Sequence, residues 1–515
     1  MAAPTSVRFS WPVRVLWLAA ALAVIQVIAL LAWYWPGAMP DTLTSGVWIA
    51  LADDFAHGDF YRPLHSALGT GGTRYMPLFF VLHGVLIKVG CAPLAAGVLL
   101  TLGSAGALVV ATALLLRQLE IPRSIAWPAA LLVLGAVSFE LMLLTVKGDF
   151  LAAALNLGGV ALTLAARRTG GRGFLIAAAT FLAAAFLTKI TTLSGLGALT
   201  AWLLWRREWR TAAALCTFSA ILMAAGVGLS VWASEGRMLE SFRAVAGGDA
   251  NLAFALTAPN RLVTECARDP LASILFVGLI GCVFFIWRTP TGAMPLLLIF
   301  SACAVTLVIF GSPGTGANHL IDPLVIAVIG LACVFAHSSS GRVWAGLTAA
   351  AFGLGIVIAW LPGVPSIRNF FTEHHRPEIA AVREFTIRAG GAITQPIFSE
   401  NPLIPIIAGQ RPFVADLFNL ELMLRHDAAL RSEILERFRT GEFGAVVLAN
   451  WPGVFLRDVD SPDAPLIVAT LPRLRTHARV AEGFYEALET RYRIVLVRRP
   501  YIYLLRSDIP FAAAR

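Results

Sequence analysis

Long apolar segments alternate with short charged loops along the first 365 residues of the chain. A helix needs roughly 20 mostly apolar residues to cross a membrane, and eleven segments come close enough to that length to be predicted as spanning helices. These segments are 13–35, 93–116, 125–145, 149–166, 173–188, 190–205, 211–233, 271–287, 294–311, 323–337 and 343–363. The pattern predicts an α-helical polytopic membrane protein with about 11 to 13 transmembrane helices. The first segment is about 23 residues long, which exceeds a signal-peptide core, so we expect an uncleaved anchor.

Arginine recurs in every second loop between these segments. The loops that carry it are RQLEIPR (117–123), RRTGGR (167–172), RREWR (206–210), RTPTGA (288–293) and SSSGR (338–342). Because Lys and Arg collect in cytoplasmic loops, the alternation predicts that these loops and the N-terminus face the cytoplasm. The loops predicted to face outward are 36–75, 146–148, 189, 234–270 and 312–322, and the C-terminal part of the chain follows on that side.

One further apolar segment, MPLFFVLHGVLIKVG (76–90), does not fit this alternation. It would make about 22 Å of helix, against about 30 Å of hydrocarbon in a membrane. We therefore expect an interfacial or re-entrant helix on the outer side. If this segment does span, another of the eleven does not.

The chain changes character after Pro365, where charged residues become frequent. Short β-like runs occur at 396–400, 411–416, 444–450 and 493–499, and a helical pattern covers 421–439. Strands that alternate with helices are typical of an α/β domain. We predict two domains: a membrane domain over 1–365, with its outer loop 36–75, and an extracytoplasmic α/β domain over 366–515.

The composition supports a membrane as the solvent for much of the chain. Of its 515 residues 58% are hydrophobic and 14% are charged, whereas a soluble protein carries roughly 25% charged residues. The net charge of +9 is explained by the cytoplasmic loops, so we expect no nucleic-acid partner. The six cysteines are scattered and show no zinc-type spacing, and the sequence has no glycine-rich phosphate loop. We predict no metal site and no cofactor, although paired acids leave a divalent metal open.

Scarce polar residues collect in the loops predicted to face outward. The chain has only three lysines, and two of them, Lys147 and Lys189, lie at predicted outer helix ends. Asp149, Asn318, His319 and Asp322 lie at the same level, and the first outer loop adds Asp41, Asp53, Asp54, Asp59, Arg74 and Tyr75. Each could be a helix cap or a side chain that snorkels to the interface. Their collection on one side instead favours a shared polar site.

Such a site suits glycosyl transfer from a polyprenyl-phosphate sugar. An ionised carboxylate within hydrogen-bond reach of an acceptor hydroxyl can remove its proton. Fixed Lys and Arg side chains can stabilise the negative charge that grows on the leaving phosphate. No nucleotide takes part, so no nucleotide-binding fold is required.

Several short motifs point to a known family. They are DTLTSGVWIALADDFAHGDFYRPL (41–64), GGTRYMPLFFVLHGVLIKVG (71–90), VKGDFLAAALNLGGVAL (146–162), LTKITTLSGLGALTAWLLWRR (187–207), GTGANHLIDPL (314–324) and SENPLIPIIAGQRPFVADLF (399–418). In type and order they resemble the GT-C superfamily of polytopic membrane glycosyltransferases. The branch is the one that contains dolichyl-phosphate-mannose protein mannosyltransferases and bacterial aminoarabinose lipid A transferases. One departure is that the acid pair opening the family's first outer loop falls on Thr44-Ser45, so the nearest acid is Asp41.

The resemblance implies an inverting transferase that moves a sugar from a polyprenyl-phosphate donor to an acceptor hydroxyl of a glycan, lipid or protein. It implies that Asp41 is the general base, with Asp53 or Asp54 as alternatives, and that Asp149 is a second acidic site residue. Lys189, Arg74 and Lys147 would bind the phosphate, while Tyr75, Asn318 and His319 would line the site. The expected location is the bacterial inner membrane, with the C-terminal domain in the periplasm.

Two other functions fit a polytopic chain with buried charges. A transporter or flippase for a lipid-linked glycan would place them near the midplane, within inverted repeats of broken helices. The sequence shows no paired Gly/Pro-broken segments in corresponding halves. A non-catalytic membrane scaffold is the second alternative, and it would keep its function without the acids.

Overall fold

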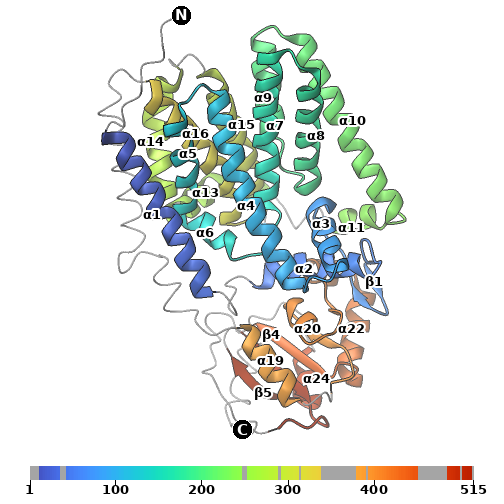
Figure 1. The fold of residues 1–515 in the computed structure, drawn as a ribbon. Helices are drawn as coiled ribbons and strands as arrows, with labels where there is room; N and C mark the ends of the chain where they lie inside the picture. Colours follow the sequence, from blue (N-terminus) through green and yellow to red (C-terminus); the bar gives the residue numbers. More distant parts are fainter. Residues whose placement is uncertain are drawn as a thin grey trace, which may run out of the picture.

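A computed structural model describes most of the chain and shows a helical bundle with a small sheet below one end (Figure 1). The described residues are 11–34, 42–245, 252–287, 292–312, 315–337, 378–389, 393–449, 484–498 and 501–512. The predicted segment 343–363 and the predicted domain boundary at 365/366 lie outside them.

The bundle is built mainly from long apolar helices. Their bounds are α1 (Trp11–Tyr34), α4 (Pro93–Gln118), α5 (Arg123–Leu132), α7 (Asp149–Thr169), α8 (Arg172–Thr188), α9 (Ser194–Trp205), α10 (Trp209–Ala233), α14 (Pro270–Trp287), α15 (Ala293–Phe310) and α16 (Ile321–His337). Among the described residues, six helical segments are long and apolar enough to cross a membrane, and α5, α8 and α9 are shorter apolar helices. In the segment that contains α16, 83% of an apolar 18-residue stretch is buried inside the protein, whereas the share for α10 is 17%. The first therefore forms the centre of the bundle and the second its edge.

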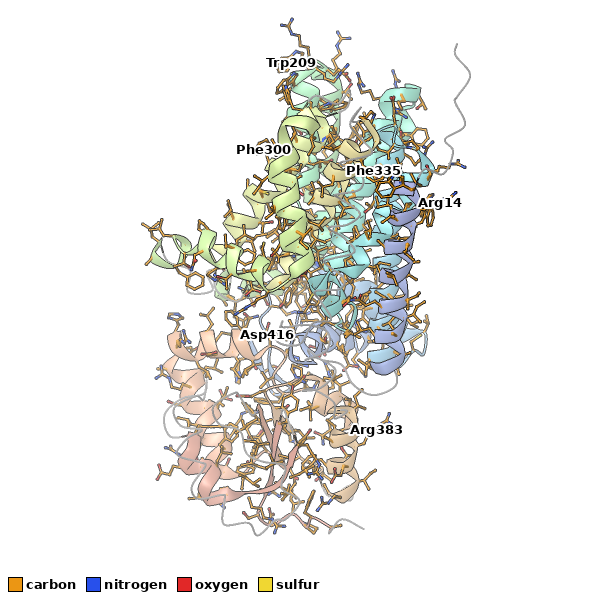
Figure 2. All side chains as sticks on the ribbon, turned by 90° about the vertical axis from the view of Figure 1, so that its left-hand side faces the viewer. Arg14, Trp209, Phe300, Phe335, Arg383 and Asp416 are labelled. Atoms are coloured by element: carbon orange, nitrogen blue, oxygen red, sulfur yellow. The ribbon has the colours of Figure 1, made fainter. Side chains whose placement is uncertain are left out.

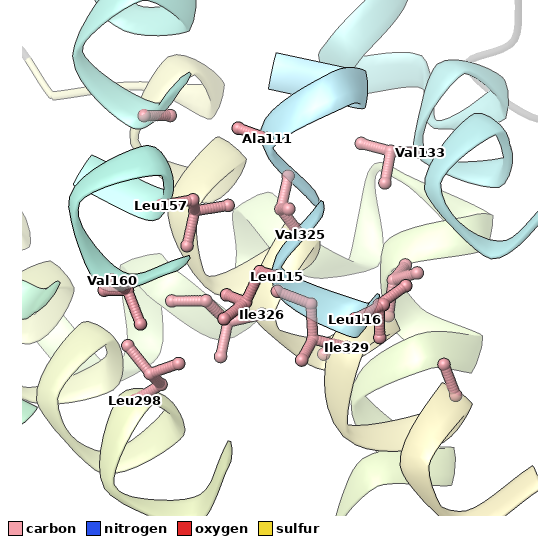
Figure 3. Packing of buried hydrophobic residues seen from close by; sticks show 14 of the residues in the cluster. Ala111, Leu115, Leu116, Val133, Leu157, Val160, Leu298, Val325, Ile326 and Ile329 are labelled. Atoms are coloured by element: carbon pink, nitrogen blue, oxygen red, sulfur yellow. The ribbon is translucent and has the colours of Figure 1, made fainter. Parts of the chain in front are cut away.

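Aliphatic side chains from α4, α7, α15 and α16 meet in the centre of the bundle (Figure 3). They include Leu115 and Leu116 of α4, Leu157 of α7, and Ile326 and Ile329 of α16, all nearly inaccessible to solvent. Lipid tails are as apolar as these side chains, so close packing rather than transfer out of water stabilises such a bundle.

The α7–α8 hairpin shows how close that packing is. A Cβ on Gly159 would lie 2.7 Å from Leu182 Cγ and 3.2 Å from the Ala178 carbonyl oxygen. Glycine is therefore needed at this position to let α8 approach α7. The hairpin turns at Gly170, which ends α7 in the left-handed region at φ 69°.

The prediction of one continuous helix over 125–145 is wrong. Helix α5 contains Pro128 and ends at Leu132, a 3₁₀ turn covers Val133–Gly135, and α6 runs over Val137–Leu143. Ala136 separates the two helices with an extended backbone, φ −79° and ψ 133°. The break redirects the chain before the loop that leads into α7.

Short elements lie between the bundle and the sheet. Helix α2 (Thr42–Ala56) is followed by the hairpin of β1 (His65–Ser66) and β2 (Gly69–Thr70), and then by α3 (Pro77–Lys88). Further along the chain, α11 (Arg237–Val245), α12 (Leu252–Ala255) and α13 (Ala258–Ala267) follow α10. With 12 residues, α3 makes about 18 Å of helix and is too short to span alone.

The C-terminal part contains a four-stranded sheet in the order β3-β4-β6-β5. Its strands are β3 (Ile397–Ser399), β4 (Ala445–Ala449), β5 (Tyr492–Arg498) and β6 (Tyr501–Arg506); β3 and β4 are parallel and the other pairs antiparallel. Its helices are α19 (Glu378–Arg388), α20 (Leu403–Ile407), α21 (Leu417–His426), α22 (Ala428–Thr440) and α24 (Phe484–Arg491). One sheet face packs on α22 and α24, and the other packs on α19.

In this part the helical prediction over 421–439 is confirmed except for a break at Asp427, and the prediction of a strand over 411–416 is wrong. The helical pattern over 421–439 forms two helices, because Asp427 ends α21 and accepts hydrogen bonds from Ala429 N and Leu430 N as the N-cap of α22. The run 411–416 is not a strand of the sheet. Its backbone instead pairs with the first outer loop, where Thr70 N donates to Phe413 O and Ala415 N donates to Thr70 O.

Arginine-bearing loops gather at the end of the bundle opposite the sheet (Figure 1). Arg167 donates to Glu208 at 2.7 Å, and Arg168 donates to Glu120 at 2.9 Å. These two pairs connect the α4–α5, α7–α8 and α9–α10 loops. The three loops therefore share one end of the molecule, as the alternation of charge along the sequence requires.

Candidate active site

The α7–α8 hairpin brings a carboxylate and a lysine together at its open end. Asp149 is the first residue of α7 and Lys189 directly follows α8, so the antiparallel helices place them side by side. Lys189 Nζ donates to Asp149 Oδ1 at 2.5 Å. The Asp149 side chain is 7% exposed and the Lys189 side chain 21% exposed. The pair is thus largely shielded, with its cation on the more accessible side.

A third segment contributes an amide to the same carboxylate. Asn318 lies in the 3₁₀ turn Ala317–Leu320 that leads into α16, and its Nδ2 donates to Asp149 Oδ1 at 3.0 Å. The loop before this turn is held by Arg261, which donates to Phe310 O at 2.7 Å and to Thr315 Oγ1 at 2.8 Å. A helix start, a helix end and a braced loop therefore converge on one oxygen atom.

Two further cations come from segments near this pair. Lys147 is buried in the loop before α7, and Arg74 lies in the segment before α3. The charges of Lys189, Lys147 and Arg74 all act on the ring of His319, next to Asn318. Residues predicted from distant parts of the sequence thus share one electrostatic environment.

The loop that carries Lys147 is fixed by its packing. Val146 N donates to Ser45 Oγ at 2.9 Å. A Cβ on Gly148 would lie 3.1 Å from Thr188 Cγ2 and 3.2 Å from Phe79 Cβ. Elements α2, α3 and α8 therefore hold the loop from three sides.

A second acid of the site is Asp322, in the first turn of α16. The charges of Lys189 and Asp149 both act on its carboxyl group. Within the described parts of the chain this carboxylate makes no hydrogen bond or ion pair at the distances found for Asp149. It is half-buried.

Asp54 lies in a separate cluster, where α2 meets the C-terminal part. Arg62 Nη2 donates to Asp54 Oδ1 at 2.5 Å, and Arg411 Nη2 donates to the same oxygen at 2.6 Å. Arg411 also pairs with Asp59 at 2.7 Å, and Arg62 Nη1 donates to Pro412 O at 2.6 Å. Asp54 therefore joins the first outer loop to the C-terminal part, and its predicted catalytic role stays a prediction.

The remaining predicted residues have different surroundings. The backbone oxygen of Tyr75 accepts a hydrogen bond from Tyr61 at 2.9 Å, and its ring lies 4.3 Å from that of Trp48. Asp41 lies outside the described residues. Burial raises the pKa of Asp53, and His57 lies 3.5 Å from its carboxylate.

Sequence reasoning did not identify the partners that the C-terminal part supplies. Arg411 and Phe418 lie in the quoted motif 399–418, but they contact Asp54 and Arg74, which are more than 300 positions away. Only the shared proximity of both segments to the predicted outer face could have suggested the pairing. In the described portion, no group of three or more His, Cys, Asp or Glu side chains is placed to hold a metal ion.

Solved structures similar to this chain identify the fold. The structure of ArnT from Cupriavidus metallidurans bound to undecaprenyl phosphate superposes with a TM-score of 0.57 and 14% identity, over 97% of this chain and 99% of that chain. The chain has the GT-C fold. The archaeal oligosaccharyltransferase AglB from Archaeoglobus fulgidus, in complex with an inhibitory peptide and a dolichol-phosphate, gives a TM-score of 0.52 at 12% identity. That match covers 86% of this chain and 70% of AglB.

The likeness lies in the GT-C fold rather than in the sequence. No protein-family model and no curated protein sequence matches the chain. At 11–14% identity the arrangement of helices is what the chain shares with these structures. The site residues are therefore argued from their own geometry.

Proposed function

We propose that the chain is an integral membrane glycosyltransferase that moves a sugar from a polyprenyl-phosphate donor to an acceptor hydroxyl. The observation that carries the proposal is the cluster at the open end of the α7–α8 hairpin. There Lys189 and Asn318 hold Asp149, and the charges of Lys147 and Arg74 act on the neighbouring His319. A concentration of cations at one end of a GT-C bundle suits a lipid phosphate.

Undecaprenyl phosphate in ArnT and dolichol-phosphate in AglB support the choice of donor. In the proposed reaction, the acceptor oxygen forms a bond to the anomeric carbon as the bond from that carbon to the phosphate oxygen breaks. The electron pair of the broken bond stays on the phosphate. Lys189, Lys147 and Arg74 would stabilise that charge, which is greatest in the transition state. A single displacement of this kind inverts the anomeric configuration.

The acceptor proton would pass to a carboxylate. The resemblance to the GT-C superfamily favours Asp41 for this role. Asp54 and Asp149 already accept hydrogen bonds from two side chains each. Asp322 is a second candidate among the described acids, because it lies beside Lys189 without an ion pair of its own. A general base must be ionised and within reach of the hydroxyl, and an Asp322 variant tests whether this residue meets both conditions.

We propose that the site faces the outside of a bacterial inner membrane. The arginine-bearing loops, joined by the Arg167–Glu208 and Arg168–Glu120 pairs, would then be cytoplasmic. The site and the sheet lie toward the other end (Figure 1). On this proposal the chain crosses the membrane about 11 to 13 times, and residues 366–515 form a periplasmic domain.

The test is a transfer assay with the purified full-length chain. Radiolabelled undecaprenyl-phosphate sugars are supplied with an envelope extract as acceptor, and transfer to the extract is measured. Lys189→Ala and Asp41→Asn should each lower the rate by about 10²–10³-fold, the cost of losing one transition-state stabiliser or a general base. Lys88→Ala is the matched control, because Lys88 is exposed on α3 and its Nζ lies 4.7 Å from the centre of the Phe55 ring, away from the candidate site.

Transfer at the wild-type rate in both site variants would refute the assignment of the site. Movement of the labelled lipid across vesicles without transfer would instead identify a flippase.

A further inference from the structure

Arg74 lies where the first outer loop meets the C-terminal part of the chain. Its guanidinium carbon is 4.9 Å from the centre of the Phe418 ring, a cation–π contact. Phe418 belongs to the first turn of α21 and is half-buried. An arginine placed by sequence in the outer loop is thus supported by an aromatic ring 344 positions further along the chain.

The backbone beside Arg74 is held by the same turn of α21. Asn419 Nδ2 donates to Gly72 O at 3.1 Å and also to Asp416 Oδ2 at 2.8 Å. Asp416 is the N-cap of α21, is 6% exposed, and lies at the junction of the helical bundle and the sheet (Figure 2). The charge of Arg74 acts on this carboxylate.

The segment that carries Arg74 also leads to the candidate active site. Arg74 precedes α3, whose Phe79 Cβ lies 3.2 Å from where a Cβ on Gly148 would be, between Lys147 and Asp149. This segment therefore contacts α21 at Phe418 and Asn419 and leads into a helix that packs against the candidate site.

We propose that Asp416 and Phe418 are positioning residues, which hold the Arg74 guanidinium toward the donor phosphate so that the C-terminal part completes the site. This inference rests on the proposed function, because it assigns a role at the same donor site. A free arginine side chain must lose most of its rotamer freedom when it binds phosphate. A ring under the guanidinium, on a helix turn that Asp416 caps, would reduce that loss in advance, as preorganised sites do.

An opposite effect competes with positioning. The negative charge of Asp416 lowers the positive potential at Arg74, so its removal alone would strengthen the binding of an anion. If Asp416 only screens Arg74, its neutralisation tightens phosphate binding; if it positions Arg74, neutralisation weakens binding. The sign of the change therefore distinguishes the two.

The experiment measures the dissociation constant of undecaprenyl phosphate for the full chain in detergent. Asp416→Asn removes the charge and keeps an efficient N-cap, and Phe418→Leu removes the ring and keeps an apolar side chain. Each should weaken binding by about three- to tenfold. The matched control is Asp427→Asn, a second aspartate N-cap in the same part of the chain, at the start of α22. It should leave the constant within about twofold.

A double-variant cycle separates positioning from general destabilisation. If Asp416 acts through Arg74, the Arg74→Gln/Asp416→Asn variant should bind no more weakly than Arg74→Gln alone. Tighter or unchanged binding in Asp416→Asn, or fully additive losses in the double variant, would overturn the inference while wild-type transfer still supports the proposed function. A wild-type chain that does not bind undecaprenyl phosphate would overturn both.

Discussion

The Asp54 cluster makes the most demanding prediction, because sequence and geometry assign this residue different roles. In Asp54→Asn the carboxylate that faces Arg62 and Arg411 becomes a neutral amide. Arg62 is 1% exposed and Asp54 2% exposed at the side chain, whereas Arg411 is 27% exposed. The variant therefore leaves the Arg62 guanidinium buried without its countercharge, while Arg411 keeps Asp59 and partial access to water.

The expected cost follows from this burial. Removing one partner of a buried ion pair costs about 3–5 kcal/mol. The lower end applies here, since the amide oxygen can still accept a hydrogen bond and the more exposed Arg411 contributes little. A loss of about 3 kcal/mol corresponds to a fall of about 6–12 °C in the unfolding midpoint of a domain of 150–250 residues. The fall should be smaller if the whole chain unfolds as one unit.

The assay is thermal unfolding of the purified chain at pH 7.5, followed by tryptophan fluorescence and alongside the transfer assay. Asp53→Asn is the matched control, because the one ion pair of the neighbouring Asp53 among the described residues is with the exposed His57, at 3.5 Å. Burial already raises the pKa of Asp53, so loss of its charge should leave the midpoint nearly unchanged. An Asp54→Asn chain that unfolds with the wild type yet no longer transfers sugar would refute the structural interpretation and restore Asp54 as a catalytic candidate.

Three further predictions follow from single positions. Burial raises the pKa of Asp416 from 3.8 to about 6. The protonated carboxyl group therefore adds about 3 kcal/mol to the free energy of unfolding. This contribution is complete below about pH 4 and is lost as the pH rises through 6. Unfolding midpoints between pH 4 and 8 should show this slope in the wild type and not in Asp416→Asn. Gly69→Ala should lower the midpoint more than Gly58→Ala, because both have positive φ but only at Gly69 would a Cβ meet the Phe413 backbone. Asp322→Asn should reduce transfer by about 10²-fold or more if this residue is the base, with undecaprenyl phosphate binding retained; equal rates would assign the proton transfer to another acid.

Much of the site could be anticipated from sequence because membranes restrict topology strongly. Once the arginine-bearing loops are assigned to one side, Asp149, Lys189 and Asn318 must lie near the other. The structure joins these three side chains directly. The alternation of charge predicted one shared side for these residues, and the structure adds a contact between Asn318 and Asp149, 169 positions apart.

The contacts of the C-terminal part could not be anticipated in this way. Asp54 and Arg411 are 357 positions apart, and no periodicity relates an outer loop to a sheet domain. Ala136 is equally uninformative: alanine favours a helix, yet tertiary packing holds it extended between α5 and α6. Local propensity fails at these places because the deciding partners are distant in sequence.

The lengths of α7 and α8 together determine whether the two ends of the α7–α8 hairpin meet. Helix α7 has 21 residues and is about 31 Å long. The turn that joins α7 to α8 therefore lies about 31 Å from Asp149, yet it determines whether Asp149 meets Lys189. One residue inserted in either arm would rotate everything beyond it by about 100° and advance it by about 1.5 Å, carrying one partner out of reach of the other. Changes in the length of either helix should therefore be tolerated far less readily in this hairpin than changes of side chain.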